Sequence, residues 1–267
     1  MKMVAREHPV IDSIACQRLI GRFIAAGSPR WVTAFPLATR SLRFTLLALL
    51  LLLPWPAAAF WLLGFSTADT LPYGGLSAIA GTGGQFTSVG DPSRSNFTPF
   101  LPHAGFRVGL GDGWDIGYRL TQVALPFSSV GPSLGGEIDV KHRLTPIDSP
   151  WQVAIVAGGA YSYLDLSDQS KSAWSPGVDL IFSRAITPRY TLISELRYVY
   201  TAIPTALGGA GQNYVNAAGV DMGMRIGLTN MVSIIPEVGV FDFVGRLANR
   251  RSNGVAAQYG SVLAFRF

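Results

Sequence analysis

The side chains of this sequence that could do chemistry are charged residues set at every second position. Glu137, Asp139, Lys141 and Arg143 follow one another in this way. Residues two apart lie on the same face of a β-strand. Two neighbouring carboxylates, such as Glu137 with Asp139, are a minimal set for general acid and base catalysis. Because Lys141 and Arg143 share their face, we interpret these acids as members of ion pairs.

Histidines offer a second route to catalysis, and beyond residue 68 the sequence has only His103 and His142. Hydrolysis or acyl transfer needs a nucleophile beside a base that a carboxylate orients. His142 falls on an apolar face near a predicted turn, and His103 has no serine pattern beside it. Neither matches the histidine-serine motif of lipid A deacylases or the paired acids of outer-membrane proteases. We expect no catalytic site, and a lipid-modifying or proteolytic enzyme remains the alternative.

The predicted loops show no metal or phosphate motif. Asp165 and Asp168 flank serines, but their spacing matches no known calcium loop. Gly81–Gly84 and Gly208–Gly211 are glycine-rich, yet neither precedes a predicted helix, as a phosphate cradle requires. We therefore expect neither a metal site nor a cofactor.

The charged residues that alternate with apolar ones are balanced in sign. A selective pore usually carries a surplus of one sign, whereas a balanced set can pair across neighbouring strands. We therefore predict that these residues line the narrow lumen of a β-barrel and hold it together by ion pairs. Small residues on the same faces leave some room in this lumen, namely Ala154, Gly158, Ala160, Gly223 and Gly260. The predicted lumen network is Arg107, Asp115, Arg119, Glu137, Asp139, Lys141, Arg143, Asp179, Glu195, Arg197, Asp221, Arg225, Glu237 and Arg266.

These side chains need strands to position them, and period-two alternation predicts about ten, with eight or twelve as the other even counts. Such runs have an apolar face and a charged face, which suits a wall between lipid and a polar interior. The fold class is therefore an all-β, antiparallel, up-and-down transmembrane barrel. The runs are 72–87, 97–109, 114–124, 134–144, 151–163, 174–187, 190–202, 214–228, 231–244 and 255–267.

The connections alternate between short and long, as periplasmic turns and extracellular loops of such barrels do. The short ones are 111–113, 146–150, 187–189 and 229–230, and the long ones are 88–96, 125–133, 164–173, 203–213 and 245–254. Aromatic residues near both strand ends predict two interfacial girdles. They include Trp114, Trp151 and Tyr190 at one end and Tyr161, Tyr163, Trp174, Tyr198, Tyr200 and Tyr214 at the other.

One run contains a proline that does not fit a regular ladder. Pro236 lacks an N–H group in the middle of 231–244, so we expect a bulge or a strand shift there. Asp242 falls on the outward face of the same run unless that bulge reverses the alternation.

The final run, 255–267, places Tyr259, Leu263, Phe265 and Phe267 on one face. Together with the alternating connections, this aromatic ending resembles small Gram-negative outer-membrane β-barrels, over roughly residues 70–267. The resemblance implies an outer-membrane location among lipid. It also implies that the barrel-assembly machinery reads these four residues as a C-terminal signal.

The front of the sequence suggests export. Residues 40–68 have the basic, apolar and small-residue order of a signal peptide, with cleavage after Ala59 or after Ala68. The second site removes the apolar Phe60–Leu63 and is the one we favour, which leaves 69–267 as the barrel domain. Residues 1–39 are an extended leader or a misassigned start. An uncleaved anchor over 44–65, which would hold a periplasmic β-protein, is the other interpretation.

Charge and cysteine content limit the partners. Residues 1–68 hold seven of the 21 Lys and Arg and two of the 16 Asp and Glu, so the rest is neutral with 14 of each. Nucleic-acid binding is therefore not expected. The one cysteine, Cys16, lies in the leader, which excludes disulfides from the exported part. We predict a non-enzymatic barrel, either a narrow passive pore or a structural protein with exposed loops, whose solute or ligand the sequence does not identify.

Overall fold

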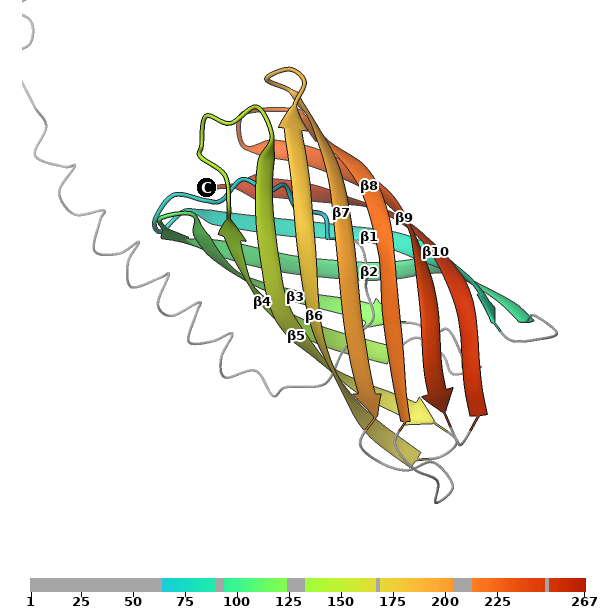
Figure 1. Cartoon of the computed structure of the whole chain (residues 1–267). Coiled ribbons are helices and arrows are strands. Elements are labelled where there is room, and N and C mark those ends of the chain that lie inside the picture. Colours follow the sequence, from blue (N-terminus) through green and yellow to red (C-terminus); the bar gives the residue numbers. More distant parts are fainter. Residues whose placement is uncertain (1–63, 90–93, 124–132, 167–168, 204–212, 248–249) are drawn as a thin grey trace, which may run out of the picture. The chain divides into compact units, whose positions relative to one another are not determined.

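The computed structural model of the protein describes residues 64–89, 94–123, 133–166, 169–203, 213–247 and 250–267. These residues form ten β-strands joined in a closed barrel (Figure 1). No helix within them is long and apolar enough to cross a membrane. The predicted leader lies outside the described residues, and so do the predicted signal peptide and anchor up to residue 63. The strands are β1 (Leu76–Val89), β2 (Arg94–Gly111), β3 (Trp114–Val123), β4 (Ser133–Arg143), β5 (Gln152–Leu166), β6 (Gln169–Ala185), β7 (Tyr190–Ile203), β8 (Asn213–Gly227), β9 (Val232–Leu247) and β10 (Arg250–Arg266).

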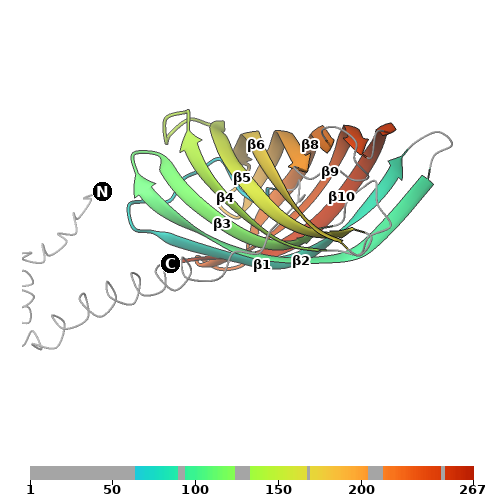
Figure 2. The same ribbon diagram turned by 90° about the horizontal axis from the view of Figure 1, so that it is seen from below.

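Each strand pairs antiparallel with its neighbours in sequence, and β1 pairs with β10 to close the ring. The amide of Phe267 donates to the carbonyl of Leu76 at 2.8 Å, next to this seam. The strands curl around a common interior in the view from below (Figure 2). The predicted antiparallel ten-stranded barrel is confirmed, including its glycine-rich first strand.

Short turns gather at the end of the barrel that holds the C-terminus, as predicted. The tightest joins β2 to β3, where Gly111, Asp112 and Gly113 all have positive φ, at 89°, 50° and 79°. Glycine adopts this conformation without steric cost, and Asp is among the few other residues that tolerate it. The sequence Gly-Asp-Gly therefore specifies this turn directly.

The predicted long connections are wrong at three of five places. Strands β5 and β6 cover most of 164–173, β9 and β10 cover most of 245–254, and β1 and β2 reach into 88–96. The other two fall mainly on 124–132 and 204–212, outside the described residues. Strands of 15 to 18 residues, such as β2, β5, β6 and β10, are longer than the roughly 9–11 residues that cross a bilayer. Polar pairs such as Asp165 with Ser170 extend the ladder. Strands predicted from hydropathy alone are therefore too short at this end of the barrel.

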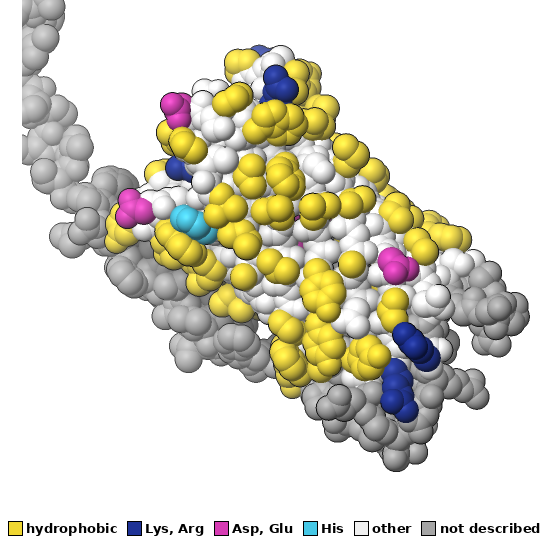
Figure 3. All heavy atoms as spheres, in the orientation of Figure 1, with side chains coloured by type: hydrophobic (Ala, Val, Ile, Leu, Met, Phe, Trp, Pro, Cys, Tyr) yellow, Lys and Arg dark blue, Asp and Glu magenta, His cyan; other side chains and the backbone are white. Residues whose placement is uncertain are grey.

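The outer surface is apolar over the middle of the barrel (Figure 3). Val220, Val240 and Leu196 are each about half exposed there. Aromatic side chains lie near both ends: Trp114, Trp151 and Tyr190 beside the short turns, and a second group at the opposite end. In that second group Tyr161 is directly across from Trp174, and Tyr200 stacks on Tyr214 at 6.3 Å. This surface suits a lipid environment with two interfaces.

Strand β9 corrects the expected bulge. Its residues alternate strictly between buried and exposed, with Pro236 and Asp242 both outward and Glu237 inward. Pairing with β10 runs through Pro236 without a shift, while pairing with β8 passes from Glu237 to Ile234 in the same register. The missing N–H of Pro236 therefore interrupts the pairing with β8 only. The register is the same on both sides of the interruption, so β9 has no bulge.

The interior is more apolar than the sequence pattern suggested. Phe241, Phe243 and Leu101 are fully buried inside the wall and belong to one apolar cluster with Ile181 and Ile193. The Phe241 ring lies over Gly219 and Gly239, where a Cβ atom would approach ring atoms within 2.8 Å. The lumen thus combines this apolar cluster with charged side chains.

Candidate functional site

The lumen is the candidate site, and ion pairs between strands make up its polar part. Register places Arg119 opposite Glu137 and Lys141 opposite Asp115. Their charged atoms are 2.7 Å and 3.4 Å apart. In the same way Arg197 of β7 pairs with Asp179 of β6. These pairs join neighbouring strands, as the balanced charges predicted.

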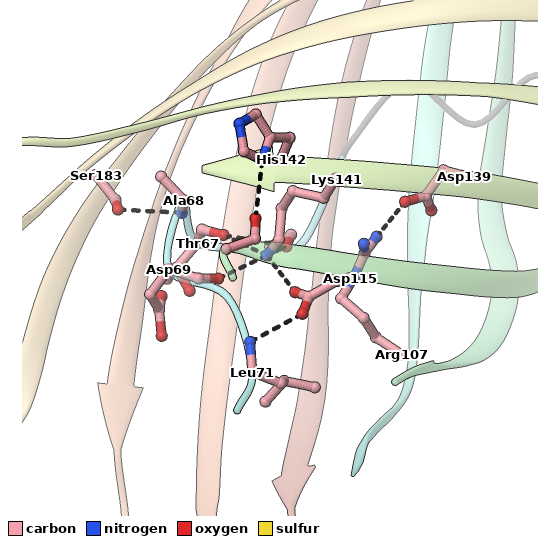
Figure 4. Close-up of polar contacts among 12 residues, drawn as sticks. Thr67, Ala68, Asp69, Leu71, Arg107, Asp115, Asp139, Lys141, His142 and Ser183 are labelled. Carbon is pink, nitrogen blue, oxygen red and sulfur yellow. Dashed lines mark hydrogen bonds and ion pairs between the residues drawn. The ribbon is translucent and has the colours of Figure 1, made fainter. Parts of the chain in front are cut away.

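A fourth pair reaches across an intervening strand. Arg107 of β2 contacts Asp139 of β4 at 2.6 Å, with Gly117 of β3 between them (Figure 4). A Cβ atom at Gly117 would lie 2.6 Å from the Asp139 carboxylate and 2.7 Å from the Arg107 guanidinium. Glycine is therefore required for this contact, which ties three strands together.

An unexpected element fills the lumen beside these pairs. Residues Gly64–Leu71, which we call the inner segment, precede β1 and form no strand. Phe65, Thr67, Ala68 and Leu71 are at most 8% exposed. Figure 4 shows the segment running past Asp115 and Lys141, with the Leu71 amide donating to the Asp115 carboxylate at 2.9 Å.

Lys141 is the main polar anchor of the inner segment. Its ammonium donates to the hydroxyl of Ser66 at 3.2 Å and to the carbonyls of Thr67 and Asp69 at 2.9 and 2.7 Å. An ammonium has three N–H donors, so these contacts use its full capacity. Lys141 thus neutralises Asp115 and also holds the segment.

A second anchor involves the carboxylate of the segment. Asp69 accepts from Arg266 of β10 at 2.7 Å. Burial alone would raise the pKa of Asp69, but the positive charges of Arg266 and Lys141 hold that pKa well below its usual value. Asp69 is therefore ionised across the neutral and mildly acidic range, and its attraction to the wall persists there.

Apolar contacts hold the other end of the segment. The Phe65 ring stacks on His103 with centroids 4.7 Å apart. It also occupies the space over Gly260, where a Cβ atom would come within 2.6 Å of the ring. The Phe65 amide donates to the Glu237 carboxylate at 2.9 Å. Burying one phenylalanine contributes about 1.5–3 kcal/mol.

Three acids of the predicted network form a group, and none of them makes an ion pair with another described residue. Glu195, Asp221 and Glu237 each offer a carboxylate oxygen, and these oxygens lie within 4.8 Å of one another. All three side chains are buried. Such a group could share protons or hold a cation. Glu195 and Asp221 are directly opposite on β7 and β8, so only the register reveals the group.

The remaining two basic residues of the predicted network stand apart from the acids. Arg225 donates to the Thr191 hydroxyl at 3.0 Å, and Arg143 lies at the end of β4 beside Gly113. Neither forms an ion pair among the described residues. The structure thus brings eight predicted residues into four strand pairs and gives Arg266 a partner in the inner segment.

The room predicted from small inward residues is largely filled. The Phe65 ring occupies the space at Gly260, Glu237 that at Gly223, and Asp139 that at Gly158. A cavity of about 80 Å³ remains between the inner segment and the charged wall. A cavity of this size has room for several water molecules.

His103 and His142 lie in different parts of the described barrel, on β2 and at the end of β4. His103 is buried in the middle of β2, with Nδ1 3.4 Å from the Leu101 carbonyl oxygen. His142 stacks on Trp114 at 4.0 Å near the turn end of the barrel. The proposed dyad of Glu137 and Asp139 is divided, because each acid contacts its own arginine.

Comparison with known proteins finds similar barrels only among solved structures. No family model and no curated protein matches the sequence. The outer membrane protease OmpT of Escherichia coli is 9% identical, with a TM-score of 0.46, over 76% of this chain and 100% of that one. The toluene transporter TodX of Pseudomonas putida is 8% identical, with a TM-score of 0.32, over 79% of this chain and 95% of that one. Neisserial surface protein A is 13% identical, with a TM-score of 0.29, over 73% of this chain and 99% of that one.

At these values the likeness carries no argument about activity. The fold is established by the barrel itself, with its closed ring of ten strands, apolar outer surface and charged interior. The chain is a β-barrel of the outer-membrane type, as its sequence indicated.

Proposed function

We propose that the protein is a non-enzymatic outer-membrane barrel whose interior is structural and closed to solutes. The observation that supports this proposal most is the lumen of the described barrel, which holds the inner segment, the ion pairs and the apolar cluster, with a cavity of about 80 Å³ between the segment and the charged wall. A passive diffusion pore needs a continuous aqueous path. Interaction with the surroundings then takes place at the strand ends opposite the short turns.

The proposal includes export and outer-membrane assembly. The signal-peptide pattern of 40–68 supplies the first step. The second is assigned to β10 and the residue after it. Tyr259, Leu263 and Phe267 are exposed on the outer surface, and Phe265 is half-buried. These residues are available to lipid and to the barrel-assembly machinery, and the surrounding apolar surface makes outer-membrane lipid the natural partner.

An enzymatic role has less support from the geometry. The described residues that come closest to a catalytic group are Glu195, Asp221 and Glu237. Glu195 lies against Gly64, and Glu237 accepts from the Phe65 amide. A substrate would have to displace the inner segment before it reached these acids.

A narrow passive pore is the second candidate, and one observation favours it. The inner segment fills the lumen without being part of the wall, since it pairs with no neighbouring strand and is held by side-chain contacts. It could therefore leave while the ring of strands stays intact. The segment would then be the closing element of a channel.

Conductance separates the two candidates. The full exported protein, purified from outer membranes and inserted into a planar bilayer, is expected to show no steady conductance. Insertion is verified by resistance of the folded barrel to protease. Regular conductance steps from this protein would overturn the closed interior. Steps that occur only after the inner segment is deleted would establish the gated pore.

A further inference from the structure

The inner segment overlaps one of the two candidate cleavage sites of the signal peptide. Cleavage after Ala59 would leave the segment in the mature protein, whereas cleavage after Ala68 would remove Gly64–Ala68. The contacts of these residues with the barrel therefore bear on where the protein is processed.

Loss of Gly64–Ala68 would leave buried groups of the barrel without partners. Lys141 would lose its contacts with Ser66 and Thr67, and Glu237 would lose the Phe65 amide. The Ser183 hydroxyl would lose the Ala68 amide, which donates to it at 3.1 Å. A buried polar group that loses its hydrogen-bond partner destabilises the folded protein. Three strands, β4, β6 and β9, would each be affected.

The charge created by cleavage at Ala68 is also unfavourable. The new amino group would belong to Asp69, whose carbonyl accepts from Lys141 and whose carboxylate pairs with Arg266. An α-amino group has a pKa of about 7.7–8.0 and is mostly positive at neutral pH. Cleavage there would add a positive charge beside Lys141 and Arg266, which are already paired with the carboxylates of Asp115 and Asp69. The intact peptide bond at this position is neutral.

The barrel wall is shaped for the segment. Gly260 of β10 lies under the Phe65 ring, and Gly109 of β2 faces the Leu71 and Pro72 carbonyls, where a Cβ atom would come within 2.6 Å of either oxygen. Within the segment, Gly64 faces the Glu195 carboxylate, which a Cβ atom would approach to 2.1 Å. At each of three strands, β2, β7 and β10, a glycine thus allows the segment and the wall to approach closely. Two of these glycines are in the wall and one is in the segment.

We infer that the protein is processed after Ala59 and that the inner segment remains in the mature barrel as a built-in plug of the lumen. The inference rests on the export that the proposed function includes. Ala57 and Ala59 supply the small residues that signal peptidase requires at the third and first positions before the cut. This site replaces the one after Ala68 that the sequence favoured.

The test is the intact mass and N-terminal sequence of the protein purified from outer membranes. A mature chain that begins at Phe60 supports the inference, and one that begins at Asp69 overturns it. A chain that still carries residues 44–63 would contradict both the processing site and the export step of the proposed function. The three outcomes differ in mass by many residues and are easily separated.

Two variants locate the cleavage site independently. Ala59→Arg places a large cation directly before the inferred cut and should abolish processing, so that the longer precursor accumulates. Ser66→Leu removes the small residue at the third position before the alternative cut after Ala68. It should leave the mature N-terminus at Phe60. Normal processing of Ala59→Arg together with blocked processing of Ser66→Leu would contradict the inference.

Discussion

A cysteine placed at Ser183 will react with a charged thiol reagent about tenfold faster or more when the barrel begins at Pro72 than when it begins at Phe60. Ser183 is 2% exposed and lies against Ala68. A tenfold change corresponds to about 1.4 kcal/mol, and burial of Phe65 alone contributes about 1.5–3 kcal/mol to keeping the segment in place. The measurement is the rate of labelling by a membrane-impermeant methanethiosulfonate in detergent-solubilised, folded protein.

The control for this experiment is a cysteine at Arg189, in the exposed turn between β6 and β7. Its labelling rate should be the same in both proteins. Equal rates at Ser183 would show that the inner segment does not cover the lumen. Should the shortened barrel fail to fold, Phe65→Ala with Leu71→Ala in the longer protein should increase labelling at Ser183 in the same direction.

Replacing Arg197 with methionine will destabilise the barrel by about 3–5 kcal/mol, the cost of leaving a buried charge without its partner. Arg197 is 8% exposed and pairs with buried Asp179. Its charge also acts on Glu195, Asp221 and Glu237. Removing the Arg197 charge therefore takes a favourable electrostatic interaction away from four carboxylates. Urea unfolding from lipid vesicles, followed by tryptophan fluorescence, measures the difference.

Two further variants show whether the destabilisation comes from the unpaired buried charge. Arg189→Met, in the exposed turn, should change the free energy of unfolding by less than about 0.5 kcal/mol. Arg197→Met combined with Asp179→Leu should regain part of the loss, since an apolar pair avoids an isolated buried charge. If Arg197→Met were as stable as the parent, the ion pairs would not be structural elements of the lumen.

The wall of the barrel could be predicted because it obeys a local rule. Alternation along each strand fixes which side chains face inward, and this placed Asp115, Arg119, Glu195 and Glu237 correctly inside. Gly-Asp-Gly fixed the turn after β2 through its positive φ values. Both signals are contained within a few consecutive residues.

The contents of the lumen could not be predicted in the same way. The inner segment has no period, and Ser66-Thr-Ala68 reads equally well as a cleavage site. Its position depends on residues far away in sequence, such as Glu237, which lies 172 positions after Phe65. The group of Glu195, Asp221 and Glu237 likewise depends on the register of β7, β8 and β9. Only the folded ring brings these residues together.

The most direct test of the plugged barrel is a chemical cross-link inside it. With Ala68→Cys and Ser183→Cys as the only cysteines after Cys16, a short thiol-specific cross-linker applied to outer membranes should join the two positions. Protease cleavage between β1 and β2 should then leave residue 68 attached to the rest of the barrel. Two free thiols that label separately, or a mature chain without residue 68, would contradict a lumen closed by Gly64–Leu71.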